Sequence, residues 1–200
     1  MSFPSSGSAS GLTFRILLAG EEGVGKTSLI LRFIQNRFEE SSTPKSLEGD
    51  FITKQFNLFG APIKLQIQDL GVTLWEEIVS YHVRDNDGIL IILDTSSKGK
   101  MKPYLDYWLK PIRQVSNDIP VIVVGNKTDL PTKINITKTA QYAAQIGSVF
   151  VETSAKTGEN VSYAFKLITS EIVKRKAAAK KASEGRRSDG LNSIFTHYDL

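Results

Sequence analysis

The sequence predicts an α/β fold in which helices cover both faces of a six-stranded, mostly parallel sheet. Short runs rich in Ile, Leu and Val alternate along the chain with longer segments that are typical of helices. Most of these runs are apolar at successive positions, as strands buried on both faces of a parallel sheet are. One further run alternates apolar and polar residues, and it predicts a single antiparallel strand at the sheet edge.

The first strand is predicted at residues 13–19, and a helix at residues 26–36 follows it after a glycine-rich loop. The alternating run at residues 51–58 is joined to a strand at residues 63–67 by the sequence FGAP, which predicts a hairpin. Helices at residues 73–83, 101–116, 137–146 and 160–180 then alternate with strands at residues 88–93, 121–125 and 148–151. Because sheets of this kind bind ligands beyond the carboxyl ends of their strands, functional motifs are expected in loops that directly follow strands.

Length and composition fit one folded domain with short tails. The chain has 200 residues, of which 40% are hydrophobic and 23% charged, as in ordinary globular proteins. We expect a disordered lead at residues 1–11, a folded domain at residues 12–178 and a basic, flexible tail at residues 179–200. No stretch approaches the roughly 20 apolar residues of a membrane span. The absence of cysteine excludes disulfides and cysteine nucleophiles, and it suits a reducing, cytoplasmic compartment.

Residues 20–27 read GEEGVGKT, which matches the phosphate-binding P-loop motif G-x-x-x-x-G-K-[ST]. The motif follows the first predicted strand and opens the first predicted helix, which is the context that it requires. Its glycines let backbone N–H groups point at phosphate oxygens, and the helix N-terminus adds partial positive charge. Lys26 can span the β- and γ-phosphates, and the Thr27 hydroxyl can bind Mg²⁺. The motif indicates a nucleoside triphosphate but does not specify its base.

Two further motifs follow later strands and indicate guanine: NKTD at residues 126–129 and ETSAK at residues 152–156. A carboxylate that accepts hydrogen bonds from guanine N1–H and N2–H₂ rejects adenine, because adenine leaves that charge unpaired. With these motifs in this order, the chain resembles the Ras superfamily of small GTPases over about residues 12–176. The sequences GDF at residues 49–51 and IKLQIQD at residues 63–69 are most similar to its Rab branch.

The resemblance implies the P-loop NTPase fold of a small G domain that holds GTP or GDP with Mg²⁺. It further implies a switch in vesicle trafficking, with guanine-nucleotide exchange factors, GTPase-activating proteins and effectors as partners. By the same resemblance, Asp129 is the carboxylate that reads guanine. Asn126 braces its loop and meets the base edge, and Lys127 packs over the ring.

Other positions match the family's base site in the same way. The resemblance places the Ala155 N–H at guanine O6 with Lys156 alongside, and Phe38 against the other face of the base. The full set of nucleotide-binding residues that it predicts is Gly20, Glu22, Gly23, Val24, Gly25, Lys26, Thr27, Ser28, Phe38, Ser46, Gly71, Asn126, Lys127, Asp129, Leu130, Ser154, Ala155 and Lys156.

The first of the family's two γ-phosphate-sensing loops departs from the usual pattern. The family has a threonine before the second strand that binds Mg²⁺ through its hydroxyl. Counting back from Asp50 places Ser46 at that position, and Thr43 is a second candidate. Glu48 stands where the family has a glycine close to the γ-phosphate, so this loop is expected to close differently. The predicted metal ligands are therefore Thr27 and Ser46, with a further contact through water.

That further contact is assigned to Asp69, which opens the second loop. This loop reads DLGVT where the family has D-x-x-G-Q, so it is one residue short. Gly71 replaces the γ-phosphate-binding glycine, and Val72 takes the place of the glutamine that orients the attacking water. Glu22 adds a carboxylate where the family has a small residue. With Lys26 kept but that glutamine replaced, we predict weak intrinsic GTP hydrolysis, since this chemistry depends on positioning and charge stabilisation.

The basic stretch at residues 174–187 is read as a solvated helix end and tail in preference to a lipid or nucleic-acid site. The family's prenylated cysteines are missing from this sequence, so no lipid anchor is predicted. Stable anchoring generally takes two signals, and we therefore expect a cytoplasmic protein whose membrane contact is at most peripheral. Nucleic acid is not an expected partner.

Two other interpretations stay open. The first is a GTP-binding scaffold or pseudo-GTPase that hydrolyses poorly, either alone or as one domain of a larger protein; the replaced glutamine at Val72 favours it. The second is a P-loop kinase or ATPase, which Asp129 and Ala155 disfavour because they match a guanine site.

Overall fold

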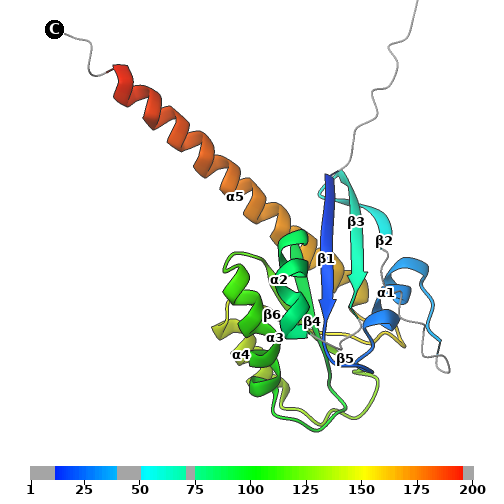
Figure 1. The fold of residues 1–200 in the computed structure, drawn as a ribbon. Helices are drawn as coiled ribbons and strands as arrows, with labels where there is room; N and C mark the ends of the chain where they lie inside the picture. Colours follow the sequence, from blue (N-terminus) through cyan, green and yellow to red (C-terminus); the bar gives the residue numbers. More distant parts are fainter. Residues whose placement is uncertain (1–11, 40–50, 71–74, 196–200) are drawn as a thin grey trace, which may run out of the picture.

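The computed structural model describes residues 12–39, 51–70 and 75–195, and for residues 75–78 and 183–195 the backbone alone. The described strands are β1 (Leu12–Ala19), β2 (Ile52–Leu58), β3 (Ala61–Asp69), β4 (Gly88–Asp94), β5 (Val121–Asn126) and β6 (Val149–Glu152). They form one sheet in the order β2-β3-β1-β4-β5-β6. All neighbouring pairs are parallel except β2 and β3, which confirms the predicted fold class (Figure 1).

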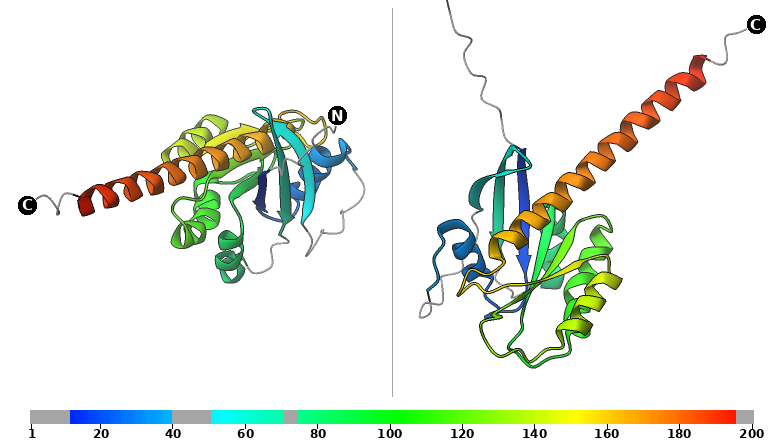
Figure 2. Two further views of the ribbon diagram at one scale, coloured as in Figure 1. Left: turned by 90° about the horizontal axis from the view of Figure 1, so that it is seen from above. Right: turned by 180° about the vertical axis from the view of Figure 1, so that it is seen from behind.

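The described residues form α1 (Lys26–Gln35), α2 (Trp75–Asp85), α3 (Met101–Val115), α4 (Ile136–Gln145) and α5 (Val161–Phe195). Helices α1 and α5 cover one face of the sheet, and α2, α3 and α4 cover the other (Figures 1 and 2). The side chains of β1 divide between the two layers by simple alternation. Ile16 and Leu18 lie in the core under α1 and α5, whereas Leu17 lies in the core under α2 and α3. This is why the strand is apolar at successive positions.

The hairpin between β2 and β3 is tighter than the sequence FGAP predicts. Phe59 and Gly60 alone form the turn, with φ angles of 52° and 80°. Ala61 and Pro62 belong to β3, and Pro62 stands opposite Asn57. Positive φ at both central residues is the signature of a two-residue turn that matches the twist of antiparallel strands. Proline is tolerated there because it is the second residue of its strand, next to the turn.

Helix α5 continues to Phe195, beyond its predicted end at residue 180 and into the segment expected to be a flexible tail. Alanine and lysine are strong helix formers, and residues 176–182 consist of them alone. The start of the basic stretch is tied to the chain around it: Lys174 pairs with Glu171 at 2.7 Å, and Lys176 pairs with Asp87 at 2.6 Å. Beyond this point the helix projects away from the sheet (Figures 1 and 2). Among the described helices, none is both long and apolar enough to cross a membrane.

Candidate nucleotide site

The P-loop connects β1 to α1, and its backbone can be formed only with glycine at two positions. Gly20 and Gly25 have φ angles of 142° and 96°, which L-residues rarely adopt. A Cβ on Gly20 would lie 2.3 Å from the Ile92 carbonyl oxygen, and one on Gly25 would lie 2.4 Å from Nδ2 of Asn126. Gly25 is also the N-cap of α1 and supplies no side-chain hydrogen bond to the helix. The positive end of α1 is therefore free of a side-chain cap at the place where phosphate is expected.

Lys26 folds back over the loop that it follows. Its Nζ donates to the carbonyl oxygens of Gly20 at 2.8 Å and Glu21 at 3.0 Å, and only 7% of the residue is exposed. Burial lowers the pKa of Lys26 below its usual value, while the carboxylates of Asp69 and Glu22 act in the opposite direction. The ammonium group is thus held at the P-loop by backbone carbonyls and by acidic neighbours.

Oxygen groups suited to Mg²⁺ meet beside the P-loop. The Thr27 hydroxyl, at the start of α1, donates to the carboxylate of Asp69, at the end of β3. Asp69 is 4% exposed. A hydroxyl and a carboxylate are hard oxygen ligands, and Mg²⁺ typically takes one or two of them together with phosphate oxygens and water. These two residues fit the predicted ion, whereas Ser46, its alternative Thr43, Gly71 and Val72 lie outside the described residues.

Asn126 joins the P-loop to the base loops, and it is 1% exposed at the end of β5. Its Nδ2 donates to the Val24 carbonyl oxygen at 2.9 Å, and its Oδ1 accepts from the Ala155 N–H at 3.1 Å. The residue predicted to brace one loop therefore connects three. The Ala155 N–H, which was predicted to contact guanine O6, is already shared with Asn126 in this structure.

The side chains of the NKTD loop are held by partners on neighbouring strands and loops. Ser154 Oγ donates to Oδ1 of Asp129 at 2.6 Å, which orients the carboxylate predicted to read guanine. Lys127 forms an ion pair with Asp94 at 2.7 Å and has a φ angle of 68°. Burial raises the pKa of Asp94, but hydrogen bonds from Lys127 and Ser96 outweigh it and lower the pKa below its usual value.

Three other predicted site residues lie at the margins of this region. Ser28 is half-buried in the first turn of α1, and Phe38 packs partly buried against the core under α1 and α5. Leu130 is 43% exposed beside Asp129. The loop that carries Lys156 is fixed from α1, because Arg32 donates to the carbonyl oxygens of both Ala155 and Lys156.

Arg32, Asp94 and Tyr104 contribute to the site, and sequence reasoning missed all three. The Arg32 guanidinium donates to Ala155 and Lys156, which are 123 and 124 positions further along the chain, so no local sequence pattern indicates this role. Asp94 could have been found by the rule that functional residues follow strands, since it ends β4. Tyr104 lies within an aromatic cluster of α3 that reads as ordinary core, and its contacts to the P-loop appear only in the fold.

All the described motifs stand at the same edge of the sheet, directly after β1, β3, β5 and β6. Residues 15–174 match the family model of the Ras family. This match spans the P-loop, Asp69 and both base loops. Proteins of this family generally bind guanine nucleotides with Mg²⁺ and interact with exchange factors, GTPase-activating proteins and effectors. The chain belongs to the Ras family and is a GTP-binding switch domain of that family.

Proposed function

We propose that this domain is a Rab-like switch that exchanges GDP for GTP, hydrolyses GTP slowly on its own, and acts through effectors in vesicle trafficking. The observation that carries the nucleotide part of the proposal is the pair of hydrogen bonds made by Asn126, which donates to the Val24 carbonyl oxygen and accepts from the Ala155 N–H. A single buried side chain thereby fixes the distance between the P-loop and the base loops. A ligand with guanine at one end and phosphates at the other matches such a spacing.

In this proposal the P-loop residues from Gly20 to Ser28 bind the phosphates, and the charge of Lys26 offsets theirs. Thr27, Asp69 through water, and Ser46 or Thr43 hold Mg²⁺, which supplies charge stabilisation at the phosphates. Asp129 selects guanine over adenine, because guanine offers the carboxylate adjacent N1–H and N2–H donors and adenine does not. Ser154 Oγ orients that carboxylate by a hydrogen bond of 2.6 Å to Asp129 Oδ1. The base is enclosed by Lys127, Lys156, Leu130 and Phe38.

Slow hydrolysis follows from two substitutions relative to the family pattern. The Val72 side chain, which stands in place of the family's glutamine, has no polar atom with which to orient an attacking water. Glu22 is exposed on the P-loop and adds negative charge next to the phosphate region. Because catalysis in this class consists of positioning and charge stabilisation, both changes are expected to reduce the rate.

Residues 12–178 are proposed as the G domain, with residues 1–11 and 179–200 as appended segments. The branch assignment rests on the Rab-like sequences GDF at residues 49–51 and IKLQIQD at residues 63–69. We place the protein in the cytoplasm, with at most peripheral membrane contact through the basic stretch. Two of its cations, Lys174 and Lys176, are already paired with acidic side chains, which limits what that stretch can offer a membrane.

A second candidate is a poorly hydrolysing GTP-binding scaffold, which Val72 favours in particular. The two functions differ in what happens to bound GTP. Purified protein is loaded with GTP and Mg²⁺, free nucleotide is removed, and bound GTP and GDP are separated by chromatography over several hours. Slow conversion to GDP supports the switch, and persistent GTP supports the scaffold.

Two controls frame this experiment. An Asp129→Ala variant keeps the P-loop but loses the guanine-reading carboxylate, so it should retain far less nucleotide. Excess ATP during loading should displace little GTP, since adenine leaves Asp129 unpaired. Equal competition by ATP would contradict a guanine site and support a P-loop kinase or ATPase instead.

A further inference from the structure

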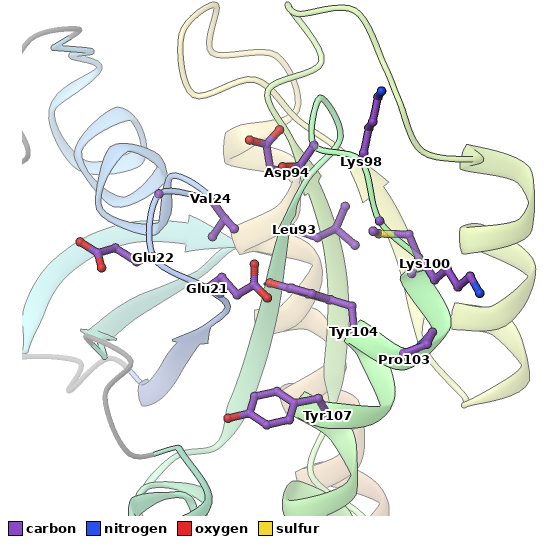
Figure 3. Close-up of a pocket in the computed structure, with 14 residues that line it drawn as sticks. Glu21, Glu22, Val24, Leu93, Asp94, Lys98, Lys100, Pro103, Tyr104 and Tyr107 are labelled. Atoms are coloured by element: carbon purple, nitrogen blue, oxygen red, sulfur yellow. Dashed lines mark hydrogen bonds between the residues drawn. The ribbon is translucent and has the colours of Figure 1, made fainter.

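The P-loop has a second side, which faces α3 across a cavity of about 480 Å³ (Figure 3). Glu21 and Glu22 line the cavity from the loop, and Tyr104 and Tyr107 line it from α3. Figure 3 shows Tyr104 reaching from α3 to the P-loop, with the Glu21 side chain turned towards it and Glu22 turned to the other side. Through its contact with the P-loop, Tyr104 links this region to the phosphate site.

The Tyr104 hydroxyl connects three elements. It donates to the Ile92 carbonyl oxygen of β4 at 2.6 Å and accepts from the Glu21 N–H at 3.2 Å. The ring lies beside Trp108, with 6.2 Å between the ring centroids. Burial raises the pKa of Tyr104 well above its usual value, so the phenol keeps its proton and can donate throughout the physiological range.

The opposite side of the same peptide group is held by Lys26. Lys26 Nζ donates to the Gly20 and Glu21 carbonyl oxygens, while the Tyr104 hydroxyl accepts a hydrogen bond from the Glu21 N–H. A Cβ on Gly20 would come within 3.3 Å of the Tyr104 oxygen and 2.3 Å of the Ile92 oxygen, so the hydroxyl fits closely against bare backbone. The first residues of the P-loop are therefore fixed from both sides, by an ammonium group within the site and a phenol outside it.

We propose that Tyr104 is a positioning residue for the phosphate site, which holds the start of the P-loop on β4 and α3 so that its N–H groups and Lys26 are preorganised for phosphate. The inference rests on the proposed nucleotide binding. Its physical basis is that ordering a loop before binding removes part of the entropic cost of binding. Loss of one hydrogen bond to the loop predicts a fall in affinity of about tenfold.

Tyr104→Phe is the direct test, because it removes the hydroxyl and keeps the ring. Tyr107→Phe is the matched control: Tyr107 lines the same cavity and contacts Trp108, is 47% exposed, and has no hydrogen bond from its hydroxyl to any described residue. Affinities for GDP and for guanosine are measured on both variants and on the unchanged protein. The Tyr104→Phe variant should bind GDP about tenfold more weakly, mainly through faster release, and guanosine within a factor of two of the unchanged protein.

A role confined to the core would lower both affinities together, and that result, or unchanged GDP binding, overturns the proposal. Hydrogen–deuterium exchange of the nucleotide-free proteins gives a second measurement. Exchange in the segment around Glu21 should quicken in Tyr104→Phe and not in Tyr107→Phe. If the unchanged protein binds no GDP, the proposed function fails, and the exchange measurement alone then decides whether Tyr104 holds the loop.

Discussion

Replacing Asn126 with alanine should weaken GDP binding by about 30-fold. The change removes the donor to the Val24 carbonyl oxygen at 2.9 Å and the acceptor for the Ala155 N–H at 3.1 Å. A buried backbone group that loses its partner costs about 1–3 kcal/mol. Because water can reach both groups once the side chain is shortened, we take the lower end for each, which gives about 2 kcal/mol in total.

This cost is expected in nucleotide binding because the two backbone groups belong to the loops that Asn126 connects. GDP dissociation is followed with a fluorescent analogue displaced by excess GDP, and the free energy of unfolding is measured in denaturant without nucleotide. Thr128→Ala is a matched control in the same loop, since its hydroxyl bonds only within the base region, to the Thr153 carbonyl oxygen. GDP binding by Asn126→Ala within threefold of the unchanged protein would refute the proposed connection between phosphate and base loops.

Three further substitutions test two residues of the P-loop, Gly25 and Glu22, and one residue of α2, His82. Gly25→Ala should abolish detectable GDP binding in calorimetry, because the new Cβ would lie 2.4 Å from Nδ2 of Asn126 at a φ of 96°; retained binding would mean that the loop yields. Glu22→Gln should raise the affinity for GTP relative to GDP about fivefold, the effect of about 1 kcal/mol of charge repulsion, in competition titrations; an unchanged ratio would place that carboxylate too far away. Burial lowers the pKa of His82 in the folded protein. The stability linked to its neutral ring is therefore fully present above the usual pKa of histidine, and it is lost as the pH falls from there towards the lowered pKa of the folded state. The Tm should therefore drop less between pH 7.5 and pH 5.5 in His82→Gln than in the unchanged protein, and equal drops would contradict this assignment.

The order of the elements could be predicted because each one carries its own local signal. Strands β4 and β5 are continuous apolar runs, and the structure buries them between the two helical layers. The P-loop could be predicted in the same way, since its glycines are required by local backbone angles at Gly20 and Gly25. Trp108 on α3 is 1% exposed, as expected for a residue that packs against the sheet.

The remaining features depend on contacts that no local pattern records. Tyr104 meets Glu21 across 83 positions of the chain, and Arg32 meets Ala155 across 123. The end of α5 was missed for a different reason. Basic residues and serine near the C-terminus suggested a flexible tail, whereas the intrinsic helix preference of alanine and lysine favours helix as far as Ala182, and the structure continues it to Phe195. At the hairpin, Pro62 suggested a loop, but the structure places it as the second residue of β3, before the residues of β3 that pair with β1.

As one continuous helix, the projecting part of α5 has a set length and direction in this structure. Beyond Lys176 the helix extends for roughly 30 Å at the usual rise per residue. A flexible chain of the same length would sample many positions, with its mean end-to-end distance set by chance. A helix instead keeps its far end at one distance and bearing from the nucleotide site. A rotation or bend of α5 where it leaves the domain would therefore displace Phe195 much further than the residues near Lys176.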